Sequence, residues 1–150
     1  MSDLLVIGYG NPLCGDDGVA WRVIAAVESL LPEGTAVAIH QLTPEWAEAI
    51  SEAALVVFVD AAVGNNQGEV GCLRVEPKIG QPGSHELTAE GLLSMATVLF
   101  GRCPPAYIVT IVGKSFEISE SLTVPVAKSV SSAAQLILEL VDMKKAPDPL

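Results

Sequence analysis

The sequence predicts an α/β domain in which a twisted, mostly parallel five-stranded sheet, with one antiparallel strand, lies between helix layers. Half of the 150 residues are hydrophobic and only 17% are charged, which is typical of a chain with a largely buried sheet. Apolar, β-branched runs alternate with segments of helical periodicity, and this order is typical of an α/β fold. The length fits a single domain spanning residues 1–150.

Five short apolar runs are predicted to be strands. They are Leu4–Ile7, Thr35–Gln41, Leu55–Asp60, Cys72–Glu76 and Tyr107–Val112. The third run is apolar and rich in β-branched residues up to Asp60 at its end, as expected of a strand that is covered on both faces. The loop between the third and fourth runs is too short for a crossover helix, so the fourth strand is predicted to be antiparallel.

Four helices are predicted from apolar residues that recur on one face. They are marked by Val19, Val23, Val27 and Leu30; by Trp46, Ile50 and Ala53; by Leu92, Met95, Ala96 and Leu99; and by Val126, Val130, Ala133, Ile137 and Val141. Asp16 and Asp17 offer N-cap oxygens to the first helix, and Thr43 precedes Pro44 as the N-cap of the second. Residues 144–150 are expected to form a frayed tail.

Charge and composition exclude several classes of function. The net charge of −10 disfavours nucleic-acid binding, which depends on basic side chains. Three widely spaced cysteines support neither a disulfide framework nor a zinc ribbon. The longest apolar stretch, Ala53–Val63, is interrupted by Asp60 and is shorter than the roughly 20 residues that a bilayer requires. The start of the chain has no basic segment of a secretory signal, and we expect a cytoplasmic protein with no membrane partner.

Common nucleotide-binding and hydrolase motifs fail at specific positions. The glycine loop after the first strand has Leu13 where a dinucleotide fingerprint requires its third glycine, and Asp16 and Asp17 follow where a pyrophosphate would bind. There is no GxSxG motif, and the sequence HELTA at residues 85–89 lacks the second histidine of HExxH. Cys14 lies near a helix start, but the two adjacent carboxylates oppose thiolate formation.

Polar residues gather where the parallel strands are expected to end. Ligands of open α/β sheets bind beyond the carboxyl ends of the strands, where residues 11–17, His40 and Asp60 should emerge. With His85 from a later loop, Asp17 and Asp60 make an O,O,N donor set that suits nickel or zinc, with open positions that would allow the ion to assist amide hydrolysis. Each residue also has a structural alternative, since aspartates cap helices and turns and a loop histidine often only hydrogen-bonds. Asp16 is expected to be mainly a cap that contributes on the order of 1 kcal/mol.

The segment Ile7–Val19, with the sequence IGYGNPLCGDDGV, resembles the opening motif of the nickel-iron hydrogenase maturation endopeptidases. The second acid of that motif corresponds to Asp17, the acid at the end of a strand to Asp60 and the loop histidine to His85. The resemblance extends over nearly the whole chain. It implies a three-layer α/β/α sandwich with a mixed five-stranded sheet.

The resemblance also implies a nickel-dependent processing endopeptidase. Such an enzyme removes the C-terminal extension of a hydrogenase large-subunit precursor after nickel insertion, and Asp17, Asp60 and His85 would be both its catalytic residues and its ligands for that nickel. The nickel is supplied by the substrate, so no tightly bound resident metal is expected. The alternative is a non-enzymatic accessory protein that delivers nickel through the same three ligands.

One segment points to a type of partner. Many members of the family have Asp-Gly-Gly-Thr after the second strand, whereas this chain has His40-Gln41-Leu42-Thr43 before Pro44. The variant resembles the proteases that serve bidirectional, NAD-linked hydrogenases. We therefore predict that His40, Gln41, Leu42 and Thr43 take part in substrate recognition, against the alternative that they only end a strand and connect it to a helix.

Overall fold

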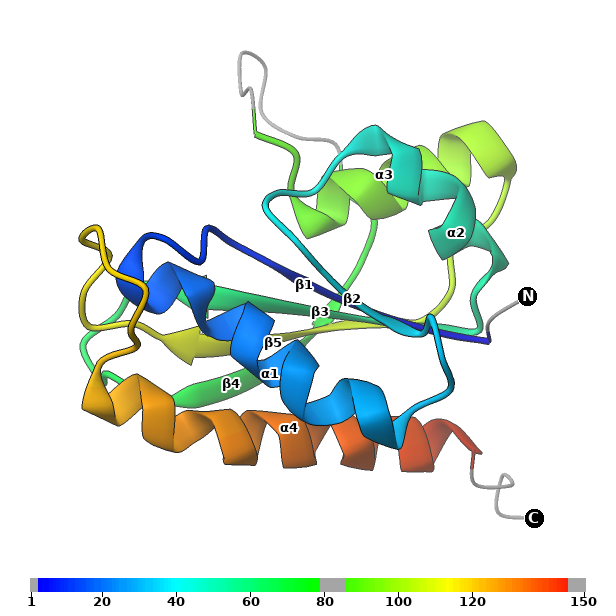
Figure 1. The fold of residues 1–150 in the computed structure, drawn as a ribbon. Helices are drawn as coiled ribbons and strands as arrows, with labels where there is room; N and C mark the ends of the chain where they lie inside the picture. Colours follow the sequence, from blue (N-terminus) through cyan, green and yellow to red (C-terminus); the bar gives the residue numbers. More distant parts are fainter. Residues whose placement is uncertain (1–2, 79–85, 146–150) are drawn as a thin grey trace.

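The computed structural model describes residues 3–78 and 86–145 (Figure 1). The strands are β1 (Leu4–Tyr9), β2 (Ala36–Ile39), β3 (Leu55–Ala62), β4 (Val70–Val75) and β5 (Ala106–Val112). The α-helices are α1 (Val19–Val27), α2 (Ala47–Glu52), α3 (Ala89–Phe100) and α4 (Val124–Lys145). Single turns of 3-10 helix precede α1 (Gly15–Gly18), follow it (Glu28–Leu30) and precede α2 (Pro44–Trp46).

The five strands form one mixed sheet in the order β2-β1-β3-β5-β4. β1 pairs in parallel with β2 and β3, β3 pairs in parallel with β5, and β4 pairs antiparallel with β5. The predicted sheet and its antiparallel strand are confirmed. From β1 the chain first adds β2 on one side of the sheet and then adds β3 and β5 on the other side. The strand order therefore reverses between β1 and β3, and open α/β sheets usually bind their ligand at the carboxyl ends of the strands at such a point.

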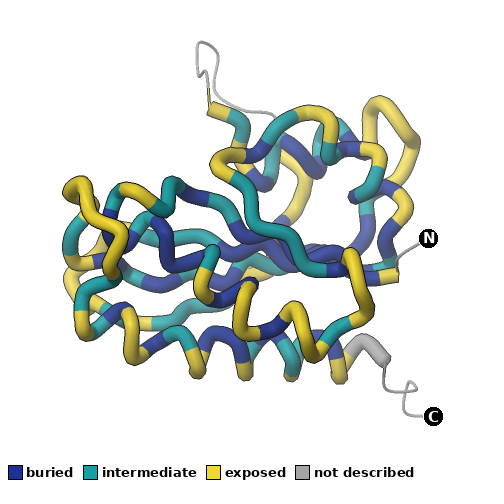
Figure 2. Tube along the Cα trace, in the orientation of Figure 1, coloured by how far each residue is buried: buried dark blue, intermediate teal, exposed yellow. Residues whose placement is uncertain are grey.

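Alternate residues of the strands face two separate hydrophobic cores. Val57 and Val59 of β3 pack with residues of α1 and α4, whereas Val56 and Phe58 pack with residues of α2 and α3. Figure 1 shows these helix pairs on opposite faces of the sheet, and Figure 2 shows the buried strands between them. Burial on both faces explains why the sequence of β3 is continuously apolar.

Helix α4 is long and apolar enough to cross a membrane by length and composition. In the structure it packs along α1 and the sheet, and Val126, Ala133, Ile137 and Val141 are buried in the shared core. Helices of a protein core can be as long and as apolar as a membrane-spanning helix. The packing of α4 against α1 and the sheet therefore accounts for its apolar residues.

The structure corrects several details at the ends of helices. Neither Asp16 nor Asp17 caps a helix with its side chain, and the Thr43 hydroxyl contacts Glu45 Oε1 instead of capping. Leu30 and Leu99, predicted to lie on buried faces, are each 64% exposed. Leu30 lies in the 3-10 turn after α1, where the α-helical periodicity no longer applies.

The ends of α3 follow ordinary capping rules. Thr88 Oγ1 accepts a hydrogen bond from the Gly91 N–H at 3.0 Å, and this satisfies one of the free donors of the first turn. Gly101 ends the helix with φ at 77°, a left-handed conformation that glycine adopts without a steric penalty.

Candidate functional site

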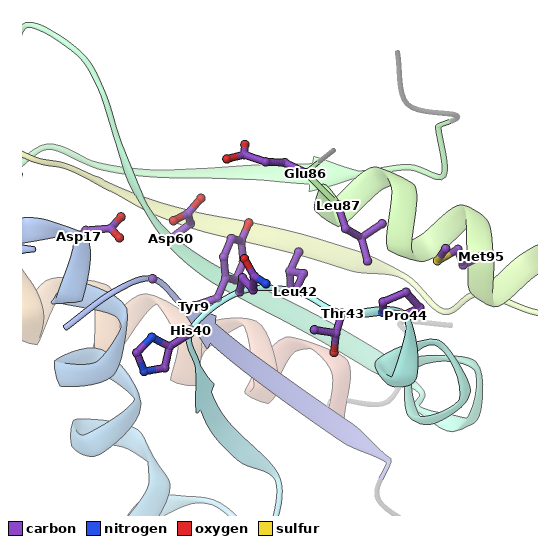
Figure 3. A pocket seen from close by; sticks show the side chains of 12 residues that line it. Tyr9, Asp17, His40, Leu42, Thr43, Pro44, Asp60, Glu86, Leu87 and Met95 are labelled. Atoms are coloured by element: carbon purple, nitrogen blue, oxygen red, sulfur yellow. The ribbon is translucent and has the colours of Figure 1, made fainter. Parts of the chain in front are cut away.

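A pocket of about 640 Å³ lies at the carboxyl edge of the parallel strands (Figure 3). Tyr9 ends β1 and Asp60 lies near the end of β3, so the pocket is at the position where the topology favours a ligand site. The other walls come from the 3-10 turn before α1, the segment after β2, the segment before α3 and α3 itself. The sequence predicted that Asp60 is the last residue of its strand. In the structure β3 continues two residues further, to Ala62.

Asp17 is held at the pocket by the glycine loop. The Asn11 N–H donates to Asp17 Oδ2 at 2.7 Å. Gly10, with φ at 148°, comes so close to the turn below it that a Cβ there would lie 2.1 Å from the Asp17 carbonyl oxygen. The indole N–H of Trp21 donates to the Gly10 carbonyl at 2.9 Å and fixes the loop from the side of α1. These contacts explain why the sequence has glycine where the loop passes over the helix start.

Asp60 lies in surroundings that disfavour its charge. Burial raises its pKa to about 6, and the nearby charges of Asp17 and Glu86 also raise it. A backbone hydrogen bond from Ala61 and the hydroxyl of Tyr9 act in the opposite direction. The pKa of Tyr9 is itself raised, first by burial and then by the Asp60 charge, so its hydroxyl stays protonated and donates to the carboxylate. We call Asp17 and Asp60 the acidic pair.

Asp16 is fully buried and points away from this pocket. Its Oδ2 accepts hydrogen bonds from the Lys114 N–H at 2.8 Å, the Ser115 N–H at 3.0 Å and the Thr123 hydroxyl at 2.7 Å. Its Oδ1 accepts from the Thr123 N–H at 2.8 Å. Burial alone would raise the pKa of Asp16, but these hydrogen bonds outweigh it and lower the pKa. The prediction that Asp16 is mainly a helix cap is wrong: it fastens the loop between β5 and α4 to the start of α1.

The structure brings together only part of the predicted site. Asp17 and Asp60 both line the pocket, whereas His85 lies outside the described residues. Within residues 3–78 and 86–145, no three His, Cys, Asp or Glu side chains form a group that would hold a metal ion. The described part of the chain therefore contributes two carboxylates to the predicted donor set.

The segment predicted to recognise substrate also lines the pocket, and its four side chains differ in burial. His40 and Gln41 are exposed, Thr43 is partly exposed and Leu42 is 5% exposed. The His40 ring packs edge-on against Trp21, with 5.6 Å between ring centroids. Leu42 is part of the pocket wall and of the core, so it is not a freely exposed contact residue as the sequence suggested.

Sequence reasoning did not place Tyr9, Gly10, Glu86, Leu87 or Met95 at the pocket. A signal existed for Tyr9, because it follows an apolar strand directly at the edge where ligands bind. Met95 was assigned to the helical core by its spacing, and that spacing does not distinguish a core position from a pocket wall.

Chemically, the pocket favours a cation at its acidic end. Among the described residues that line it there is no lysine, arginine, serine or cysteine, so neither a fixed positive charge nor a serine or cysteine nucleophile lies beside the acidic pair. The Asp17 charge raises the pKa of Asp60, and a divalent ion bound between the two carboxylates would remove this repulsion.

Comparison with known proteins identifies the fold. No family model and no curated protein matches the sequence. Among solved structures, the hydrogenase maturating endopeptidase HybD from E. coli aligns with a TM-score of 0.76 and 25% identity over 93% of this chain and 92% of that one. The fold is that of hydrogenase maturation endopeptidases.

Two archaeal structures with this fold are similar to the chain at lower identity. The hydrogenase maturation protease HycI from Thermococcus kodakarensis aligns with a TM-score of 0.71 and 22% identity over 93% of each chain. The hydrogenase 2 maturation peptidase from a Thaumarchaeota archaeon aligns with a TM-score of 0.67 and 23% identity over 92% of this chain and 97% of that one. The predicted mixed five-stranded α/β architecture is confirmed, and the likeness covers more than nine-tenths of this chain.

Proposed function

We propose that this protein is an endopeptidase that removes the C-terminal extension of a nickel-iron hydrogenase large-subunit precursor after nickel insertion. The observation that carries the proposal is the acidic pair, which faces a pocket at the ligand-binding edge of a fold shared with maturation endopeptidases. The opening motif around Asp17 and the position of Asp60 on β3 agree with the resemblance noted in the sequence.

In this proposal Asp17, Asp60 and His85 bind the nickel that the precursor carries. Burial is the main cause of the raised Asp60 pKa, and the charges of Asp17 and Glu86 raise it further. A bound divalent cation would compensate these charges. Glu86, the sequence neighbour of His85, lines the same pocket, which supports a role for His85 as the third ligand. Since nickel arrives with the substrate, the isolated protein is expected to hold no metal tightly, and chelators are expected to leave its stability unchanged.

The chain's own residues would bind and orient the precursor. Tyr9 holds the Asp60 carboxylate by a hydrogen bond, and the Asn11 N–H holds that of Asp17, so both acids are positioned before the substrate arrives. A cation bound there supplies Lewis acidity toward a peptide carbonyl. Because the described pocket residues include no serine or cysteine, water is the proposed nucleophile.

The segment 40–43 supports a bidirectional, NAD-linked hydrogenase as the source of the precursor. We further propose that processing takes place in the cytoplasm. His40, Gln41 and Thr43 are accessible at the pocket, where they can contact a bound precursor. Replacing residues 40–43 with Asp-Gly-Gly-Thr is expected to impair processing of this precursor type without disturbing the nickel ligands. It should also lower the stability of the protein, because the core loses the Leu42 side chain. An unchanged preference in a folded variant would mean that the segment is only a connector.

The test is incubation of the purified protein with nickel-loaded precursor, followed by intact-mass measurement. We expect the precursor to lose its C-terminal extension, and the nickel-free precursor to stay intact. Movement of nickel between the proteins while the loaded precursor stays full length would favour the alternative, a non-enzymatic accessory protein that delivers nickel.

Variants connect the reaction with the acidic pair. Asp60→Asn is expected to abolish cleavage, because an amide binds a divalent ion far more weakly than a carboxylate does. Asp142→Asn is the matched control, since Asp142 is exposed on α4 in the layer that does not line the pocket. Equal cleavage by Asp60→Asn and the control would contradict the assigned site.

A further inference from the structure

We infer that a docking surface for the folded body of the precursor lies beside the pocket and is formed by the exposed apolar side chains of Leu13, Val63, Phe116 and Ile118. We call these four residues the apolar rim. The inference rests on the proposed endopeptidase function. It adds a second contact with the precursor, outside the pocket proposed to bind its nickel.

The apolar rim comes from three loops at the carboxyl edge of the parallel strands. Leu13 lies in the loop after β1, Val63 follows β3, and Phe116 and Ile118 lie in the loop between β5 and α4. Val63 is 91% and Ile118 92% exposed, while Leu13 is 52% and Phe116 39% exposed. Figure 2 shows that the loop between β5 and α4 is exposed over most of its length. Apolar side chains gathered in this way on a protein surface mark an interaction site.

A backbone hydrogen bond joins two of these loops next to the acidic pair. The Ser119 N–H donates to the Leu13 carbonyl oxygen at 2.9 Å, so the backbone at Ile118 and Ser119 runs beside the loop after β1. This loop also contains Asn11, whose N–H donates to the Asp17 carboxylate. The part of the rim formed by Leu13 and Ile118 therefore borders the acidic pair.

The third loop is joined to the rim through Gly113. The Gly113 N–H donates to the Ala62 carbonyl oxygen at 2.8 Å, which brings the segment at Val63 to the start of the loop between β5 and α4. The Phe116 ring lies against the same glycine, because a Cβ on Gly113 would be 2.5 Å from Phe116 Cζ. Val63 and Phe116 thus lie on two sides of one residue, and the rim is a single surface.

The loop between β5 and α4 is fixed before a partner binds. The Asp16 carboxylate accepts hydrogen bonds from Lys114 and Ser115 near the start of the loop and from Thr123 at its end. Figure 1 shows this loop beside the start of α1. A loop held at both ends loses little conformational freedom on binding, which reduces the cost of forming an interface.

The charge around the rim disfavours a second copy of this chain as the occupant. The chain has a net charge of −10, and Glu117 and Glu120 are exposed in the same loop as Ile118, where Lys114 is the only basic residue. Two copies placed rim to rim would bring these glutamates and both acidic pairs together, and like charges at an interface cost energy. The complementary partner has an apolar surface bordered by basic side chains.

The precursor is the partner that the position of the rim favours. A pocket of about 640 Å³ has room for a short segment of chain, whereas stable protein–protein interfaces bury about 800 Å² on each partner. Recognition of a protein substrate therefore requires surface beyond the pocket. The fully buried centre of an interface is more apolar than the rest of a protein surface, as the rim is. A precursor docked on the rim would hold its nickel and its C-terminal extension near the acidic pair.

The experiment measures kcat and kcat/KM for nickel-loaded precursor with two double variants of the full chain. Val63→Ser with Ile118→Ser removes the two most exposed side chains of the rim. We expect kcat/KM to fall at least about tenfold, because the apolar area that the precursor buries is lost, while kcat at saturating precursor falls less than twofold. Intact-mass measurement follows the cleavage.

Val98→Ser with Met143→Ser is the matched control. Val98 on α3 and Met143 on α4 are 77% and 72% exposed, and neither belongs to the rim or to the pocket lining, so kcat/KM should stay within twofold of wild type. Both double variants replace two exposed apolar side chains with serine, so the comparison isolates the position of the loss.

Three outcomes would overturn the inference in different ways. If the wild-type protein cleaves the precursor and the rim variant has a kcat/KM within twofold of wild type, the docking surface alone is overturned. If light scattering shows a wild-type dimer that the rim variant converts to a monomer, a second copy occupies the rim in place of the precursor. If the wild-type protein leaves the nickel-loaded precursor uncut, the endopeptidase proposal is overturned and the docking surface with it.

Discussion

Asp16 and Asp17 are adjacent in the sequence, yet their carboxylates lie in opposite surroundings. Asp16 is completely buried, accepts four hydrogen bonds and has a lowered pKa. Asp17 instead faces a pocket in which its charge raises the pKa of Asp60. A carboxylate with all its acceptor sites occupied stabilises the fold, whereas like charges held together without compensation reduce stability and are typical of functional sites.

The largest stability effect is expected at Asp16. Asp16→Ala removes the buried carboxylate that accepts partly buried hydrogen bonds from Lys114, Ser115 and Thr123, and we expect the free energy of unfolding to fall by about 3–5 kcal/mol. Thr123→Val removes the hydroxyl contact alone and should cost about 1 kcal/mol. Urea denaturation at pH 7 measures the unfolding free energy of both variants. If Asp16→Ala costs no more than Thr123→Val, Asp16 does not hold the loop.

The stabilising effect of Asp16 should also depend on pH with a definite sign. Because its pKa is lowered in the folded state, its contribution is complete above the ordinary aspartate pKa and is lost as the pH falls through the lowered value. The difference in unfolding free energy between wild type and Asp16→Ala should therefore shrink toward low pH.

The acidic pair should show the opposite behaviour. A rise in the Asp60 pKa from 3.8 to about 6 corresponds to a cost of up to about 3 kcal/mol when the group is ionised. Asp60→Asn keeps an acceptor for Tyr9 and removes the charge, so it should stabilise the protein at pH 7. The gain in stability should diminish as the pH falls from about 6 to about 4, because Asp60 of the folded wild-type protein then becomes protonated and loses its charge. Thermal denaturation across this range is the measurement, and destabilisation at pH 7 would contradict the assigned repulsion.

The smallest effect is expected at Tyr9. Tyr9→Phe removes the hydroxyl that lowers the Asp60 pKa, so this pKa should rise above its wild-type value of about 6. The loss of stability should be about 1 kcal/mol, because one partly buried hydrogen bond is lost. NMR titration of the Asp60 carboxyl carbon reports the shift, with Tyr107→Phe as control for loss of a hydroxyl on β5, outside the pocket lining. An unchanged titration would mean that Tyr9 does not position Asp60.

The sequence predicted what depends on local pattern. The continuous apolar run of β3 and the short connection to β4 predicted the mixed sheet, and the recurrence of apolar residues on one face predicted the four α-helices. The position of Asp17 and Asp60 at one edge followed from the parallel strands, since the carboxyl ends of such strands lie together.

What could not be predicted depends on contacts between distant segments. The partners of Asp16 lie 98 to 107 residues away, and no local rule distinguishes such an acid from a helix cap. Likewise, the pocket residues Leu42, Leu87 and Met95 come from two connecting segments and a helix that meet only in the folded chain. His85 lies outside the described residues, so its role stays a prediction.

The division of roles between Asp16 and Asp17 is tested most directly by one paired assay. Asp16→Asn and Asp17→Asn are incubated with nickel-loaded precursor at a temperature at which circular dichroism shows both to be folded, and cleavage is followed by intact mass. We expect folded Asp16→Asn to process the precursor despite its lower stability, and Asp17→Asn to leave it uncut. Processing by Asp17→Asn together with inactivity of folded Asp16→Asn would show that the two roles are assigned the wrong way round.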